Sequence, residues 1–360
     1  MYGQAIDGAP QAGQVSKGLG IDLRSDTVTR PTPGMLAAMS IASTGDDVFA
    51  DDPSVNQLQD RLADELGFEA GLFMPTGTMS NLCALMAHCE RGDEYLVGQL
   101  AHTYKYEGGG AAVLGSIQPQ PLEQEADGSI AIERIAAAIK ADDPHFARTR
   151  LLALENTFGG QVMPQDYIHK ASAFAREKGL GVHLDGARLY NAAVAQGLQA
   201  REIARHFDTV SVCLSKGLGA PAGSVLMGSS KLLAKAHRVR KMLGGGMRQA
   251  GVLAAAGSYA LDHHVAGLAD DHRRADAIAQ ALRAIPGLEV KVATNMVWVY
   301  PGSDAHVLDR LVAFLSAHGV VLLNRRPLRL VTHLDLSEEQ CLALCGLIKT
   351  FSASSSSTAS

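Results

Sequence analysis

Aromatic side chains are scarce in this chain, since Phe, Tyr and Trp together make up 5% of its 360 residues. Glycine is abundant at 37 residues, which suggests many tight loops and argues against an aromatic-rich β-sandwich. An excess of basic charge is also missing: 32 Lys and Arg against 37 Asp and Glu give a formal net charge of -5. That balance argues against a general nucleic-acid binder, which needs a strong basic field.

No stretch of about 18 apolar residues is free of charge, so we expect no membrane-spanning helix. Residues 1–20 have neither a basic start nor an apolar stretch, so we expect no signal peptide. The five cysteines form no CxxC pair and most lie in apolar runs, which favours buried thiols over a disulfide framework or a metal centre. These absences predict a cytoplasmic protein without a metal site that binds neither membrane nor nucleic acid.

The length and the pattern along the chain predict two domains between two tails. At about 150 residues per domain, a chain of this length holds two. We expect disorder at 1–19 and in the Ser-rich segment 352–360, because neither can bury apolar surface. The large domain is expected at 20–265 and the small domain at 266–351.

Short apolar runs alternate with longer amphipathic runs in the large domain, which predicts an α/β fold with a mostly parallel sheet. The expected strands there are 68–74, 94–97, 151–155, 181–185, 209–214 and 224–227, and the clearest helices are 52–67, 80–89 and 167–178. The small domain is predicted as α+β. Its expected strands are 288–292, 296–299 and 328–330, and its expected helices are 268–285, 306–318 and 337–351.

Polar residues follow several of the expected strands at the point where each strand ends. Asp185 and Lys216 each follow an apolar run, and the turn Thr76-Gly77-Thr78 follows 68–74. In an open α/β sheet, ligands bind at the C-terminal ends of the strands. A carboxylate, a lysine beside glycines and a helix N-terminus together match the needs of one cofactor, pyridoxal 5'-phosphate (PLP).

Each of these residue types meets a chemical requirement of PLP. A lysine amine such as Lys216 holds the aldehyde as a Schiff base. The pyridine nitrogen stays protonated beside a negative charge, and Asp185 at ~4 Å would contribute about 4 kcal/mol at an effective dielectric of about 20. The phosphate needs N–H donors, which the turn Gly77-Thr78-Met79 offers at a helix N-terminus. Each motif alone is weak, because such residues usually belong to turns and caps, so the order and spacing of the three carry the prediction.

Seven segments of the chain resemble the low-specificity L-threonine aldolases, which are PLP enzymes of the aspartate-aminotransferase fold type. The resemblance runs from residue 21 to about residue 351. The segments are 22–29 (DLRSDTVT), 45–48 (GDDV), 75–78 (PTGT), 155–157 (ENT), 185–188 (DGAR), 215–219 (SKGLG) and 244–248 (GGGMR). The resemblance implies PLP-dependent transferase fold type I, with PLP as cofactor, an amino acid as substrate and a homotetramer as the assembly.

The resemblance also implies a role for each residue that matches the family's motifs. Lys216 would hold the PLP aldehyde, Asp185 would pair with the ring nitrogen, and His102 would lie over the ring. The other cofactor-binding residues would be Gly77, Thr78, Met79, Arg188 and Ser215, with Lys241 and Arg248 reaching a neighbouring subunit's site. The substrate carboxylate would be bound by Ser25, Arg188 and Arg329, and the β-hydroxyl would lie near His102 and His145.

The implied reaction is reversible retro-aldol cleavage of L-threonine, L-allo-threonine and related L-β-hydroxy-α-amino acids to glycine and an aldehyde. The sequence leaves open whether His102, or His145 acting through water, takes the hydroxyl proton. The alternatives are a transaldolase, a serine hydroxymethyltransferase-like enzyme, a β-eliminating lyase and a silent PLP-binding protein. A nicotinamide-dependent enzyme is disfavoured, because no GxGxxG follows the first strand.

The chain departs from the family's pattern in a few places. Phe158 stands where a histidine is common, Phe49 where a tyrosine is common and Ala50 where a glycine is common, and the segment 324–329 is a residue shorter. These departures leave the PLP-binding residues in place. They bear on substrate preference, because Phe158 removes a hydrogen-bonding side chain and adds an apolar wall.

Overall fold

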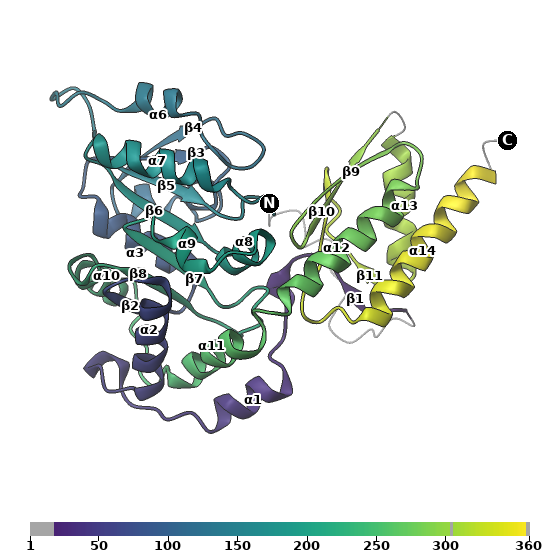
Figure 1. Cartoon of the computed structure of the whole chain (residues 1–360), viewed down its shortest axis with the longest axis horizontal. Helices are drawn as coiled ribbons and strands as arrows, with labels where there is room; N and C mark the ends of the chain where they lie inside the picture. The colour runs from purple at the N-terminus through teal and green to yellow at the C-terminus, as the bar shows by residue number, and fades with distance from the viewer. Residues whose placement is uncertain (1–17, 303–304, 358–360) are drawn as a thin grey trace. The chain divides into compact units, whose positions relative to one another are not determined.

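The computed structural model describes residues 18–302 and 305–357 (Figure 1). Its contacts divide the chain into a large unit of residues 29–266 and a small unit that joins the residues up to Val28 with those from Gly267 onward. The sequence places residues 20–28 in the large domain. The contacts place them in the small unit, because β1 (Ile21–Asp22) pairs in parallel with β11 (Val320–Val321). Within the described ranges, no helix combines the length and the apolar character that crossing a membrane requires.

The large unit is built on a seven-stranded sheet with the strand order β2-β8-β7-β6-β5-β3-β4. Its strands are β2 (Ala70–Met74), β3 (Asp93–Gly98), β4 (Gln118–Leu122), β5 (Arg148–Glu155), β6 (Gly181–Gly186), β7 (Thr209–Cys213) and β8 (Ser224–Gly228). The pairs from β4 through β7 are parallel, whereas β8 is antiparallel to both β2 and β7. The predicted α/β fold with a mostly parallel sheet is therefore confirmed.

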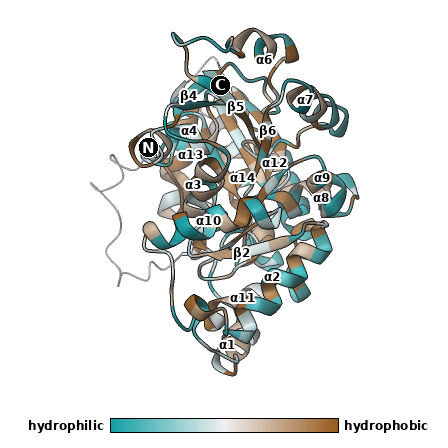
Figure 2. Cartoon of the chain, turned by 90° about the vertical axis from the view of Figure 1, so that its left-hand side faces the viewer, coloured by the Kyte–Doolittle hydropathy of each residue, from teal (hydrophilic) through white to brown (hydrophobic). Residues whose placement is uncertain are grey.

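Helices alternate with these strands along the chain, and their hydropathy varies from residue to residue as expected for half-buried helices (Figure 2). They are α1 (Pro33–Ser40), α2 (Pro53–Leu66), α3 (Gly77–His88), α4 (His102–Lys105), α5 (Gly110–Val113), α6 (Ile132–Ala138), α7 (Gln165–Glu177), α8 (Leu189–Gln196), α9 (Ala200–Ala204), α10 (Ser230–Met242) and α11 (Gly251–His263), with a 3-10 turn at Asp47–Phe49. The bounds of α2 follow from its caps, since Asp52 accepts from the N–H of Val55 and Gly67 ends the helix at φ 80°.

One edge of the sheet is formed by β4, which the sequence pattern does not predict. The strand reads Gln-Pro-Gln-Pro-Leu and pairs in parallel with β3. Pro119 and Pro121 have no backbone N–H and cannot complete a ladder on both sides, so such a sequence forms a strand only at an edge. This is why the composition hides the strand.

The small unit combines a three-stranded antiparallel sheet, in the order β12-β10-β9, with three long helices around one core. Its elements, besides β1 and β11, are a 3-10 turn at Asp26–Val28, α12 (Leu268–Arg283), β9 (Leu288–Ala293), β10 (Met296–Pro301), α13 (Ala305–Ala317), β12 (Leu328–Val331) and α14 (Glu338–Ser357). Helix α14 continues through Ser357, six residues beyond the predicted end. Buried Phe351 and a hydrogen bond from Ser352 Oγ to Ala284 O hold this part of the helix. Residues 1–17 and 358–360 of the expected tails lie outside the described residues.

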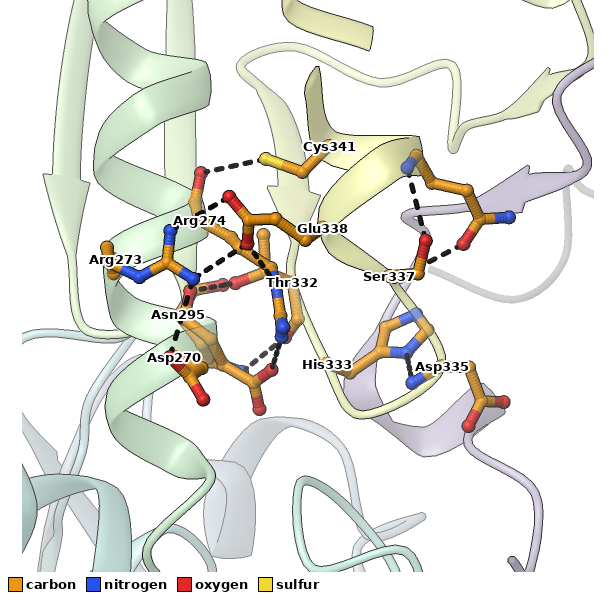
Figure 3. A network of polar contacts seen from close by, with 12 residues as sticks. Asp270, Arg273, Arg274, Asn295, Thr332, His333, Asp335, Ser337, Glu338 and Cys341 are labelled. Carbon is orange, nitrogen blue, oxygen red and sulfur yellow. Dashed lines mark hydrogen bonds and ion pairs between the residues drawn. The ribbon is translucent and has the colours of Figure 1, made fainter. Parts of the chain in front are cut away.

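Polar contacts join α12, α14 and β12 inside the small unit (Figure 3). Arg273 Nη2 lies 2.7 Å from Glu338 Oε2, and Thr332 Oγ1 donates to Asp271 O at 2.6 Å. Cys341 belongs to the same network, through a contact from its Sγ to Arg274 O. All five cysteines, each inside the described ranges, are free thiols, and four of them are buried.

Candidate active site

The C-terminal ends of β5, β6 and β7 bring several of the predicted site residues together. Glu155 ends β5 and lies in register with Asp185 on β6, while Ser215 and Lys216 lie within three residues of the end of β7. Lys216 and the segment that follows Asp185, including Arg188, line one small cavity. The Lys216 amine and the Asp185 carboxylate therefore lie at the same end of the sheet, where its parallel strands have their C-termini.

The carboxylate of Asp185 is buried and held at both oxygens. Asp185 is 3% exposed. Oδ1 accepts from the N–H of Ala187 at 3.1 Å, and Oδ2 accepts from Asn81 Nδ2 at 2.9 Å. These two donors fix the orientation of the carboxylate.

His102 is the first residue of α4, shortly after β3, and two acidic side chains hydrogen-bond to it. Its Nδ1 lies 2.8 Å from Glu107 Oε1, and its backbone N–H donates to Glu155 Oε2 at 2.7 Å. The hydrogen bond with Glu107 raises the pKa of His102. Burial, together with the charge of Asp185, raises the pKa of Glu155 to about 7. The site therefore contains a histidine and a carboxyl group whose pKa values are both raised, a pattern typical of functional sites.

The N-terminus of α3 lies beside the end of β7. Thr76 caps the helix by accepting from the N–H of Met79 at 3.2 Å, so this amide is engaged within the helix. A Cβ at Gly77 would lie 3.8 Å from the Cys213 Sγ, an ordinary van der Waals contact. Cys213 Sγ in turn lies 3.4 Å from Ser215 Oγ. Of the predicted turn, the amides of Gly77 and Thr78 remain as the donors that the helix itself leaves without an intrahelical partner.

Other predicted residues lie apart from this group within their own surroundings. His145 is exposed in the loop before β5 and hydrogen-bonds Asp143 at 2.6 Å, and its described contacts join it to neither His102 nor Lys216. Arg248 is also exposed and lies 3.1 Å from Asp46 Oδ2. Lys241, at the end of α10, is exposed as well.

In the small unit, the two predicted carboxylate-binding residues Arg329 and Ser25 belong to neighbouring segments. Arg329 lies on β12 and donates from Nη2 to Arg24 O at 3.0 Å, next to Ser25 in the chain. Its guanidinium also lies 6.0 Å from the ring of Trp298. An aromatic face of this kind restrains a guanidinium without neutralising it.

Sequence reasoning assigned no role to three residues around Asp185. These are Asn81, Glu107 and His183, and all three lie in one connected set of hydrogen bonds. The available signals were spacings: Asn81 follows Thr78 by one helical turn, and His183 precedes Asp185 by two strand residues, which places both on one face of β6.

Comparisons with known proteins identify the family of the chain. The family model described as beta-eliminating lyase matches residues 22–303. The low specificity L-threonine aldolase of Escherichia coli (strain K12) is 52% identical over 334 residues, which cover 92% of this chain and 99% of that protein.

Two solved structures share the fold. That of Leishmania major threonine aldolase has a TM-score of 0.78 at 21% identity and covers 92% of this chain and 99% of its own. A structure of SPT with PLP has a TM-score of 0.72 at 17% identity and covers 93% of this chain and 88% of its own. They show PLP-dependent transferase fold type I. Because the family model matches most of the chain and the Escherichia coli protein is 52% identical to it, this chain belongs to the beta-eliminating lyase family, among the low-specificity L-threonine aldolases.

Proposed function

We propose that the chain is a PLP-dependent carbon–carbon lyase that cleaves L-threonine, L-allo-threonine and related L-β-hydroxy-α-amino acids to glycine and an aldehyde, reversibly. The 52% identity to an L-threonine aldolase over nearly the whole chain supports the reaction class. The structural observation that carries the proposal is the cavity lined by Lys216 and by the segment after Asp185. A lysine amine and a buried carboxylate at one site are the two groups that PLP chemistry requires.

The residues present fit PLP. Asp185 offers a buried charge for the ring nitrogen, and Lys216 offers the amine for the aldehyde. The amides of Gly77 and Thr78 at the start of α3 and the hydroxyl of Ser215 suit the phosphate, which favours a helix N-terminus. When bound, PLP supplies an acceptor for the electron pair that is released as the Cα–Cβ bond breaks.

We assign to His102 the role of the base that takes the proton of the β-hydroxyl. Its Nδ1 is engaged by Glu107, which leaves Nε2 as the ring nitrogen that can take the proton. The hydrogen bond with Glu107 raises the pKa of His102, which makes its ring a stronger base for that proton. His145 is the second candidate. Because it is exposed and bonded to Asp143, it would act from a neighbouring copy or after a movement of its loop.

We assign the binding of the substrate carboxylate to guanidinium groups. Arg188 lines the cavity with Lys216, and Arg329 carries a fork that can meet a carboxylate with two hydrogen bonds. Ser25, three residues after β1 and next to the carbonyl that Arg329 binds, is the hydroxyl donor of this set.

The assembly and location of the protein are also proposals. The resemblance supports a homotetramer in which Lys241 and Arg248 reach a neighbouring subunit, and their exposure is compatible with this role. The use of cysteine supports a cytoplasmic location. Light scattering on the PLP-loaded protein tests the assembly, with a mass of four chains expected and a monomer contradicting it.

A substrate panel tests the reaction. The PLP-loaded protein is incubated with L-threonine, L-allo-threonine and L-phenylserine, and aldehyde and glycine are measured; L-serine is tested in parallel for pyruvate and ammonia. Aldehyde with glycine supports the aldolase, and no aldehyde from any of the three contradicts it. Pyruvate with ammonia would favour β-elimination instead. Dependence on an acceptor aldehyde would favour a transaldolase, and dependence on a folate would favour a serine hydroxymethyltransferase-like enzyme.

A further inference from the structure

Asn81 connects two acids at the centre of the large unit. It lies on α3, is 2% exposed, and its Nδ2 donates to Asp185 Oδ2 and to Glu107 Oε1, each at 2.9 Å. Both acceptors are carboxyl oxygens, so the amide nitrogen, and not the amide oxygen, must face them. The orientation of Asn81 therefore follows from the chemistry of its neighbours.

The other end of Asn81 is held by a chain of hydrogen bonds with one direction. Because Asn81 Oδ1 can only accept, His183 Nε2 donates to it, at 3.2 Å. His183 is fully buried, which lowers its pKa to about 3, so the ring is neutral and its Nδ1 accepts. The donor to Nδ1 is the Thr209 hydroxyl, at 2.9 Å. We call Asn81, His183 and Thr209, together with His88, the relay.

The relay ends at His88, whose Nε2 lies 2.9 Å from Thr209 Oγ1. Since the Thr209 hydroxyl already donates to His183, His88 must donate here. Burial lowers the pKa of His88 to about 4, so this ring is neutral too. His88 lines a cleft of about 500 Å³ together with Gly181, the first residue of β6, and Asp208, which directly precedes β7. The relay therefore runs from the starts of these strands to the carboxylate at their ends.

Asp185 lies among two other acidic side chains. Burial, together with the charge of Asp185, raises the pKa of Glu107 and of Glu155. The Nδ2 group of Asn81 donates to both Asp185 and Glu107, and so fixes these two carboxyl groups relative to each other. A carboxylate that was free to turn would not present its oxygens to the cofactor ring in one orientation.

We infer that Asn81, oriented by His183 and Thr209, is a positioning residue that holds the Asp185 carboxylate in the orientation in which it meets the cofactor ring nitrogen. This inference rests on the proposed use of PLP. It adds three residues, none of which touches the cavity at Lys216, to those that control how the carboxylate meets the ring.

Two readouts test this inference without relying on turnover. The apoprotein is titrated with PLP to give an apparent Kd, and the absorbance of the bound cofactor is followed with pH. Asn81→Leu keeps the volume and removes the donors, so we expect PLP to bind at least about tenfold more weakly, as expected for loss of a hydrogen bond to a charged group. The pH midpoint of the absorbance change of the bound cofactor should fall, because the ring loses its proton more readily when the Asp185 carboxylate is no longer held beside it.

Thr209 supplies the matched pair of variants, which remain informative if Asn81→Leu does not fold. Thr209→Val breaks the relay between His183 and His88, and we expect the same two changes at smaller size, about threefold in Kd. Thr209→Ser restores the hydroxyl and should behave as wild type. Ser211→Ala is the control, because Ser211 is buried on the same strand but bonds Ser80 and Ser224 instead.

The outcomes separate this inference from the proposed function. Wild-type Kd and pH midpoint in both Asn81→Leu and Thr209→Val would overturn the inference while leaving the proposed function intact. An equal loss in Thr209→Val and Ser211→Ala would also overturn it, because strand packing would then explain the effect. A wild-type protein that binds no PLP would overturn the proposed function, and the inference with it.

Discussion

Arg240 and Asp47 form a buried ion pair in the large unit, with Nη2 2.9 Å from Oδ2 and the two side chains 2% and 6% exposed. Arg240 Nη1 also donates to Phe73 O at 2.7 Å. One side chain thus joins α10 to the segment 45–49 and to β2, just before the turn assigned to the phosphate. Burial raises the pKa of Asp47 despite the neighbouring guanidinium, so the pair is held at a cost in desolvation.

Arg240→Met should lower the free energy of unfolding by about 3 kcal/mol at pH 8, because it leaves a buried carboxylate unpaired. The loss should be smaller at pH 5, where Asp47 can take up a proton. Urea unfolding at both pH values measures it, with Arg238→Met as the control because Arg238 is exposed on the same helix. The double variant Arg240→Met, Asp47→Leu should lose less than Arg240→Met alone. Equal losses for Arg238→Met and Arg240→Met would argue against an energetically important pair.

Lys216→Ala should abolish turnover and the covalent attachment of PLP that borohydride reduction reveals, since no other amine is assigned to the aldehyde. Mass spectrometry of the reduced protein and the aldehyde assay measure the two effects. Lys231→Ala, on the exposed face of α10, should retain both. If Lys216→Ala kept its activity and its reducible PLP, the assignment of the lysine would be wrong.

Glu155→Gln should flatten the pH dependence of stability between pH 5 and pH 8. In the folded protein the pKa of Glu155 is raised to about 7, above the unfolded value of about 4.3. Its contribution is therefore fully present below pH 4 and is lost as the pH rises through 7, with an upper limit of about 4 kcal/mol. Glutamine still accepts from the N–H of His102 and has no proton to lose.

Urea unfolding of the apoprotein at pH 5 and pH 8 gives the difference for Glu155→Gln, with exposed Glu177→Gln as its control. A Glu155→Gln protein whose stability changes with pH as much as the wild type would place the titrating group elsewhere.

Arg329→Gln should raise the KM for L-threonine at least about tenfold, because a bidentate contact with a carboxylate is lost. Arg329→Lys should lie between this variant and the wild type, since an ammonium lacks the planar fork. The absorbance of bound PLP should not change in either. Arg283→Gln on α12 is the control in the same unit. An unchanged KM would remove Arg329 from the substrate site.

The sequence predicts the positions of Asp185 and Lys216 because each polar residue interrupts a long apolar pattern at a strand end. For the relay the sequence offers only the spacings of Asn81 and His183, and these do not single out a site. His183 lies inside the apolar strand β6 and looks like a core residue, and its partner Asn81 is 102 residues away in the chain. The pair of Arg240 and Asp47 is hidden for the same reason. Contacts of this kind depend on which strands are neighbours, and periodicity does not contain that information.

The placement of β1 shows a second limit. A strand of two residues is too short for any alternation, so its pairing with β11 could not be predicted. The end of α14 shows a third: the Ser-rich composition favours disorder, but Phe351 buries its ring and extends the helix. In both cases a tertiary contact overrides a local preference.

The two prolines of β4 also affect how copies of this chain can associate. Pro119 and Pro121 lie on one side of the strand, and β3 is hydrogen-bonded on the other. A foreign strand that approached this border would find no N–H at either proline and could not lengthen the sheet there. Any fibre that grew by strand addition would have to begin elsewhere.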